Sequence, residues 1–155
     1  MRRRCKGWMG AVLAAVVTAC AGGDPDVTSP DPSIAPFVGL WDAEAFVITS
    51  VAQPVVVADL LISGEFFITI ESSGQYTATL TFGQLMPVTE FGQVSVSGNF
   101  IRLDTSGEPA PCPAAAEYSF TGADYVTLTG PTCFDFNLDG ELEDAQLTQA
   151  WRRNR

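Results

Sequence analysis

The most chemically specific stretch of this chain is DFNLDGELED, residues 135–144. Side chains with oxygen atoms occupy its first, third and fifth positions, and Gly140 follows at the sixth. Hard oxygen ligands at alternate positions let one short segment wrap a calcium ion at about 2.4 Å, and the glycine permits the turn. The predicted ligands are the side chains of Asp135, Asn137 and Asp139, the carbonyl of Glu141, and a further carboxylate from Glu143 or Asp144.

The same stretch departs from the EF-hand pattern, because its twelfth position is Gln146 where a bidentate glutamate is expected. No helix-forming segment precedes it either, so it resembles the calcium loops found between β-strands. The alternative is an acidic hairpin loop whose Asp139-Gly140 turn merely joins two strands. We expect calcium as the only cofactor, if the loop binds one.

Two cysteines, Cys112 and Cys133, sit beside prolines and flank the segment 117–129. We predict that they form a disulfide, since the amino terminus described below directs the chain to an oxidising compartment. Closing a loop of about 20 residues should stabilise the fold by around 3 kcal/mol. A metal or redox pair is the alternative, but it lacks a histidine and a CxxC spacing.

Catalytic groups are scarce. After residue 6 the chain contains no lysine and no histidine, which removes the usual bases and amine nucleophiles. Carboxylate pairs such as Glu143-Asp144 can hydrolyse glycosides, but only if one carboxyl has a raised pKa in a cleft. Nothing in the sequence marks such a group, so we expect a protein that is not an enzyme.

The charge distribution excludes nucleic acid as a partner. All 18 acidic residues lie at Asp24 or later, whereas four of the eight basic residues lie within the first six positions. Without those four, the chain has a formal charge of -14. Such a surface repels phosphate backbones.

The amino terminus has the layout of a secretory signal. Arg2, Arg3, Arg4 and Lys6 precede an apolar run from Trp8 to Val17 that is too short to span a bilayer stably.

Val17-Thr18-Ala19-Cys20 resembles the lipobox of bacterial lipoproteins. The resemblance implies a signal peptide over residues 1–19, diacylation of Cys20 and attachment to the membrane through that lipid. Ala21 follows the cysteine where an aspartate would favour the inner membrane, which implies the outer membrane of a Gram-negative bacterium. An ordinary signal with a chance cysteine is the alternative.

Residues 24–36 are rich in Pro, Asp and Ser and offer almost nothing to bury. Residues 20–36 are therefore predicted to be a flexible tether, and residues 37–155 a single domain.

That domain is organised around the stretch 65–82, EFFITIESSGQYTATLTF. Apolar residues at period two, broken by Ser72-Ser73-Gly74, predict a β-hairpin with one buried face. The side chains predicted to face inward are Phe66, Ile68, Ile70, Tyr76, Leu80 and Phe82.

Further strands are predicted at 37–50, 92–97, 100–104, 117–121, 125–129 and 145–153, with a connection at 83–90. We expect a short helix at 55–63, ending at Gly64. Eight strands joined mostly to their sequence neighbours favour an all-β fold, an antiparallel up-and-down barrel, in which closure removes exposed edges. A two-sheet β-sandwich is the alternative.

Gly39-Leu40-Trp41 at the start of the first strand resembles the G-x-W motif of lipocalin-like (calycin) proteins. The resemblance implies that an arginine after the last strand, Arg152 or preferably Arg153, packs across Trp41 at the closed end of the barrel. It also implies that the monomeric barrel holds a small apolar ligand on the six inward side chains of the hairpin. The alternative is a filled barrel in a structural or interaction lipoprotein.

Overall fold

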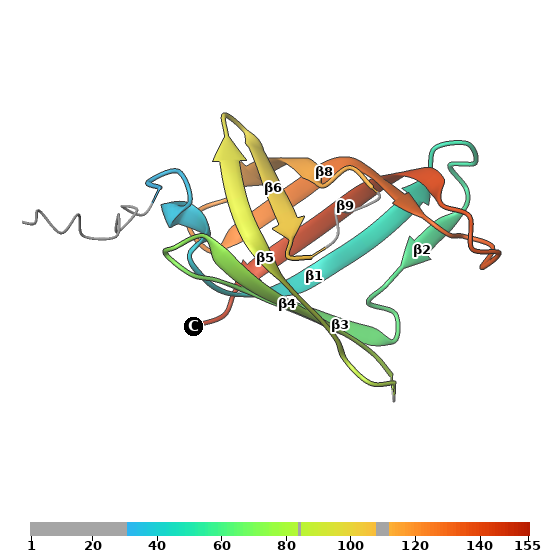
Figure 1. The fold of residues 1–155 in the computed structure, drawn as a ribbon, viewed down its shortest axis with the longest axis horizontal. Coiled ribbons are helices and arrows are strands. Elements are labelled where there is room, and N and C mark those ends of the chain that lie inside the picture. The colour runs from blue at the N-terminus through green and yellow to red at the C-terminus, as the bar shows by residue number, and fades with distance from the viewer. Residues whose placement is uncertain (1–30, 84, 108–111) are drawn as a thin grey trace, which may run out of the picture.

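The computed structural model describes residues 31–83, 85–107 and 112–155, and these form an all-β barrel (Figure 1). Its elements are the 3-10 helix η1 (Ala35–Phe37) and the strands β1 (Gly39–Ser50), β2 (Val57–Asp59), β3 (Gly64–Ile70), β4 (Gln75–Phe82), β5 (Val88–Ser97), β6 (Phe100–Thr105), β7 (Ala115–Phe120), β8 (Tyr125–Phe134) and β9 (Glu143–Arg153).

The sheet closes on itself. Strands β3 to β9 pair in sequence order, and β1 pairs with both β3 and β9. Every pairing is antiparallel, so β1 and β3–β9 form a closed barrel of eight strands, with β2 as an extra strand on β1. The predicted up-and-down barrel is confirmed, and the alternative β-sandwich is excluded because the eight strands form one continuous sheet.

The barrel has two unlike ends. Strands β3, β5, β7 and β9 end on the side of the barrel where β1 begins directly after η1, and we call this the closed end. Strands β1, β4, β6 and β8 end at the opposite side, which we call the open end.

Aromatic packing fills the closed end. Phe37 is fully buried, and its ring centroid lies 4.9 Å from that of Tyr118 and 5.0 Å from that of Phe120. Trp41 is also fully buried and donates its indole N–H to the Phe37 carbonyl at 2.7 Å. Rings at these distances and tilts add about 0.5–1.5 kcal/mol per pair beyond area burial, so this end is a solid core.

A β-bulge at Glu44 changes which face of β1 points inward. Ala43 pairs with Trp151 and Ala45 pairs with Ala150, the next residue along β9. Glu44 is therefore an extra residue of β1 that has no pairing partner on β9. An extra residue reverses the alternation, because side chains in a strand repeat with period two. As a result Trp41 faces the interior before the bulge and Ile48, 6% exposed, faces it afterwards.

The predicted helix at 55–63 is wrong. Val57–Asp59 forms β2, whose residues pair with Val47, Ile48 and Thr49 of β1. Strand β3 pairs only with the first four residues of β1, which leaves the outer half of that edge free for another strand. The β-branched valines favour a strand over a helix, and the unpaired edge of β1 lets the segment form a strand by pairing there.

Three strands are longer than predicted. β5 starts at Val88, within the predicted connection 83–90, β8 continues to Phe134, and β9 begins at Glu143. The hydrophobic alternation that marks these strands is weak at their open-end halves, so the sequence signal stops before the backbone pairing does.

The folded part also begins earlier than predicted. Within the predicted tether, Ile34 is only 4% exposed and belongs to the core, and residues 35–37 form η1. The described part of the tether therefore packs on the closed end. This segment has too few apolar residues for its sequence to predict a structural element.

Candidate ligand site at the open end of the barrel

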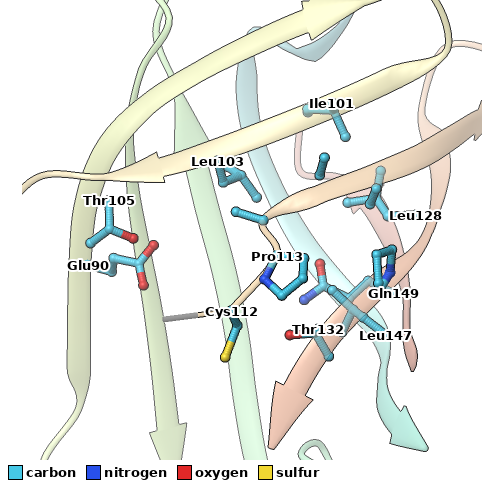
Figure 2. A pocket seen from close by; sticks show the side chains of 14 residues that line it. Glu90, Ile101, Leu103, Thr105, Cys112, Pro113, Leu128, Thr132, Leu147 and Gln149 are labelled. Carbon is cyan, nitrogen blue, oxygen red and sulfur yellow. The ribbon is translucent and has the colours of Figure 1, made fainter. Parts of the chain in front are cut away.

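Two cavities occupy the open half of the barrel interior. The first has a volume of about 240 Å³ and the second about 220 Å³. They share Glu90, Leu103 and Gln149 in their linings, so they adjoin at these three residues. Figure 2 shows the side chains of the first cavity, with Leu103, Leu128 and Leu147 on its apolar walls.

The second cavity is the more apolar of the two. Its wall is made by residues of β1, β3, β4, β5, β6 and β9, namely Phe46, Phe66, Ile68, Tyr76, Ala78, Leu80, Val88, Glu90, Leu103 and Gln149. Ligand pockets are typically lined in this way, by apolar side chains with a few polar groups that fix orientation.

The polar group at the junction is the carboxylate of Glu90. It accepts a short hydrogen bond from the Tyr76 hydroxyl, and that hydroxyl lies 3.5 Å from the Thr105 Oγ1 atom. Glu90 stands opposite Ala78 in the ladder between β4 and β5, so the small methyl group leaves room beside the carboxylate. Glu90 and Thr105 lie side by side in Figure 2.

Gly92 sets the position of the Tyr76 ring. The two residues are partners in the ladder between β4 and β5. A Cβ atom at Gly92 would lie 2.5 Å from the Tyr76 Cε1 atom and 2.1 Å from the Asp104 carbonyl oxygen. Only a glycine allows the ring to lie flat over β5, and from there its hydroxyl reaches Glu90.

Burial of the ring, and after it the hydrogen bond to Glu90, raises the pKa of the Tyr76 phenol above its usual value. Tyr76 is therefore a neutral hydrogen-bond donor at physiological pH. It holds one oxygen of the Glu90 carboxylate in a fixed place.

Gln149 is the second polar group shared by the cavities. It is 5% exposed, and its Oε1 atom accepts a hydrogen bond of 3.0 Å from the Trp151 indole N–H. That bond orients the amide so that its NH₂ group is available as a donor.

The structure places four of the six hairpin residues predicted to bind a ligand in the second cavity: Phe66, Ile68, Tyr76 and Leu80. Ile70 lies in the core cluster, 1% exposed, towards the closed end. Phe82 is half-buried at the end of β4 and outside both linings. Sequence reasoning missed Glu90 and Gln149, because polar residues interrupt the apolar alternation that identified the inward face.

At the closed end the structure brings Gly39, Trp41 and Arg153 together. The Arg153 guanidinium carbon lies 4.1 Å from the Trp41 ring centroid, and the Nη2 atom donates to the Pro36 carbonyl at 2.7 Å. Gly39 has φ +132°, and a Cβ atom there would lie 2.8 Å from Arg153 Nη1. These residues are structural and lie away from the cavities. Arg152 points outward and pairs with Glu44.

The predicted disulfide is confirmed. Cys112 and Cys133 are bonded, with their Cα atoms 5.3 Å apart, and the bond ties the segment before β7 to β8. Cys112 also lines the first cavity (Figure 2), so the disulfide holds one wall of the open end.

The acidic stretch lies between β8 and β9, where its loop side chains accept hydrogen bonds from the loop backbone. Asp135 accepts from the N–H groups of Asp139 (3.2 Å) and Gly140 (2.8 Å), and Asp139 accepts from Glu141 (2.8 Å). Asn137 accepts a further, longer bond from Asp139.

Glu143 and Asp144, the other predicted ligands, belong to β9 and pair with Phe134 and Cys133. Within the part of the chain that the structure describes, no three Asp, Glu, His or Cys side chains lie close enough together to hold a metal ion. Calcium binding stays a prediction, in which the ion competes with the backbone N–H groups for the carboxylates.

The predicted signal peptide and the lipidation site Cys20 lie outside the described residues. Over residues 31–83, 85–107 and 112–155, no helix has the length and apolar character needed to cross a bilayer.

No protein-family model matches the chain, and a search of curated proteins found no match. Among solved structures, the chain is similar to a structure of EF1p2_mFAP2b bound to DFHBI, with 12% identity and a TM-score of 0.50. That match covers 79% of this chain and 97% of the other. At such low identity the likeness shows the fold alone.

Two further structures align with lower scores. A de novo designed fluorescence-activating β-barrel is 12% identical over 79% of this chain and 97% of its own, with a TM-score of 0.40. Rv2717c from M. tuberculosis is 16% identical over 81% of this chain and 99% of its own, with a TM-score of 0.41.

Proposed function

We propose that this chain is a lipid-anchored, lipocalin-like binding protein that holds a small, largely apolar molecule in the open half of its barrel. The observation that carries the proposal is the pair of adjoining cavities of about 240 and 220 Å³. A dry cavity of about 150 Å³ holds benzene, so either cavity has room for a somewhat larger molecule. The fold neighbour bound to DFHBI supports the idea that a barrel of this kind accommodates a small ligand.

The lipocalin-like assignment rests on the closed end. Gly39, Trp41 and Arg153 take the relative positions that the resemblance implies, with a cation over the indole ring. They seal that end, while the cavities lie at the other end.

Anchoring rests on the amino-terminal sequence, with its basic head, apolar run and lipobox ending at Cys20. The described chain enters the barrel at the closed end through η1. A tether attached there leaves the open end facing away from the point of attachment, which gives a ligand free access. We place the protein at the outer membrane of a Gram-negative bacterium, on the evidence of Ala21.

A binding role is favoured over catalysis because the cavity polar groups comprise one carboxylate, one phenol, two threonine hydroxyls and one amide. A filled barrel with only a structural or interaction role is less well supported, since Phe37, Trp41 and Phe120 pack together at the closed end whereas the open half holds the two cavities.

Ligand binding is tested by native mass spectrometry after gentle extraction, and by titration of purified protein with the fluorescent probe N-phenyl-1-naphthylamine. We expect a co-purifying small molecule and saturable probe binding. Ala78→Phe, which fills the second cavity and leaves the first, should weaken probe binding while the circular dichroism spectrum stays unchanged. Ser119→Phe, on the exposed outer face of β7, is the matched control and should bind as the wild type does. A wild-type protein that neither carries a molecule nor binds the probe would refute the proposal.

Anchoring is tested separately. Mass spectrometry of the mature amino terminus should find an acylated Cys20, and Cys20→Ser should remove the acyl mass. An unmodified chain that begins elsewhere would end the lipoprotein assignment and leave the binding proposal intact.

A further inference from the structure

Among the described residues, the linings of the two cavities contain one charged group, and no cationic side chain lies in either lining. Among the described residues, Glu90 is the only charged side chain in the lining of either cavity. The four arginines of the described residues lie elsewhere: Arg102, Arg152, Arg153 and Arg155 pair with Asp104, Glu44 and Asp124. Within the part of the chain that the structure describes, no salt bridge involves Glu90.

The carboxylate is held in place by a hydrogen bond. Tyr76 donates to its Oε1 atom, and the Tyr76 ring is itself fixed over Gly92. The described side-chain hydrogen bonds of Glu90 end there, and the residue lines both cavities while it is also exposed to solvent at the open end. Ala78, its ladder partner, supplies the free space beside it. A positioned carboxylate at the wall of an apolar cavity is an acceptor that favours a cationic donor, because charge-assisted bonds are stronger than neutral ones.

The electrostatic field of the whole domain is negative, like the charge of Glu90. Beyond residue 6 the chain has four basic residues against 18 acidic ones. A strongly negative surface raises the local concentration of cations and repels anions, so it favours the approach of a positively charged ligand to the open end.

We propose that the cavities select an apolar molecule with a protonated amine, whose ammonium group pairs with Glu90 while its hydrocarbon part fills the apolar walls. This inference rests on the proposed binding function and specifies its ligand class. An alkyl or aryl amine fits, whereas a fatty acid of the same length would place a second carboxylate against Glu90.

The test compares three molecules that share one chain and differ in the head group: n-octylammonium, 1-octanol and octanoate. The described residues form a closed barrel with its own core, so the unlipidated chain from residue 21 onward is used. Each compound displaces N-phenyl-1-naphthylamine at pH 7 and low ionic strength. We expect octylammonium to displace the probe at about a tenfold lower concentration than octanol, as one charge-assisted bond predicts. Octanoate should need the highest concentration.

Glu90→Gln keeps the shape of the side chain and removes its charge. In this variant the concentrations at which octylammonium and octanol displace the probe should lie within about threefold of each other. The concentration needed for octanol should change little. Glu65→Gln makes the same change in net charge on the exposed outer face of β3, so it should keep the wild-type preference. Tyr76→Phe should weaken the preference in part, because the carboxylate loses its positioning bond.

The outcomes separate the two proposals. Equal displacement by the three compounds, or an unchanged amine preference in Glu90→Gln, overturns the selectivity for amines and leaves the binding function standing. Absence of any binding, by the probe and by direct calorimetry with each compound, overturns both.

Discussion

Arg153 does more at the closed end than shield Trp41. Its guanidinium lies over the indole, and its N–H groups donate to the carbonyls of Pro36, Val38 and Ala123. The carbonyls of Pro36 and Val38 belong to the segment that leads into β1, and that of Ala123 lies in the turn before β8, so one side chain of the last strand joins this segment to the turn.

We expect Arg153→Ala to lower the free energy of unfolding by about 2–3 kcal/mol, from lost hydrogen bonds and the cation–π contact. Arg153→Lys keeps the charge but not the planar fork, so it should recover less than half of that loss. Chemical denaturation measures both. Arg152→Ala is the control, since its exposed pair with Glu44 should contribute little. Equal stability of wild type and Arg153→Lys would contradict the role of the fork.

Asp135 organises the acidic loop whether or not calcium binds. It accepts from two backbone N–H groups, and Asp135→Ala should therefore cost about 1 kcal/mol of stability in calcium-free buffer.

Calcium binding by this loop is a separate prediction. We expect isothermal titration of the wild type with calcium to give a binding curve, and Asp139→Asn to weaken it, since a neutral amide replaces a charged ligand. Glu65→Gln should leave the curve unchanged. No heat in the wild type, or an equal curve for Asp139→Asn, would end the calcium prediction.

At the scale of elements, the β1 bulge is what lets one strand serve both ends of the barrel. Its first half places Trp41 in the closed core, and its second half places Phe46 at the second cavity. Without the extra residue, one of these halves would turn its apolar side chains to solvent.

Deletion of Glu44 is therefore expected to abolish cooperative unfolding or to prevent soluble expression. Glu44→Gln keeps the bulge and only weakens the exposed pair with Arg152, so its melting temperature should stay close to that of the wild type. Thermal unfolding followed by circular dichroism distinguishes the two. A deletion variant that melts like the wild type would show that the register adapts without the bulge.

The β5 strand shows why part of the site escaped sequence reasoning. Residues 88–91 lack a clear alternation of apolar and polar side chains, and a charged residue at the inward position 90 is more typical of a loop than of a strand. Backbone pairing with β4 nevertheless continues to Val88, because Leu80, Thr79 and Ala78 offer an unpaired ladder edge. The partner strand decided the length of β5.

At the scale of the whole molecule, the barrel is a solid closed half joined to a hollow open half. The entry segment, residues 31–37, belongs to the solid half, since Ile34 and Phe37 are buried there. Residues 31–37 are accordingly part of the domain rather than of its tether.

A chain that begins at residue 31 should be as stable as one that begins at residue 21. A chain that begins at residue 38 loses two buried side chains and should be less stable by at least about 4 kcal/mol, given the usual cost of emptying a core site. Urea denaturation measures the difference. Equal stability of the chains beginning at residues 31 and 38 would place the domain boundary after Phe37.

The sequence by itself determined the all-β class and the inward face of the central hairpin, and it favoured a barrel over a sandwich and a disulfide between Cys112 and Cys133. These inferences follow from the alternation of apolar and polar residues, from the short connections and from the positions of two cysteines. All of these features are visible in short stretches of the sequence. Only the tertiary structure decided where the barrel is filled and where it is hollow. Interior volume depends on side chains that converge from all eight strands, and the alternation along one strand shows which residues face inward but not what they meet there. The position of Glu90 between the two cavities is one such result. It depends on Ala78 opposite it on β4 and on the hydrogen bond from Tyr76, whose ring lies over Gly92.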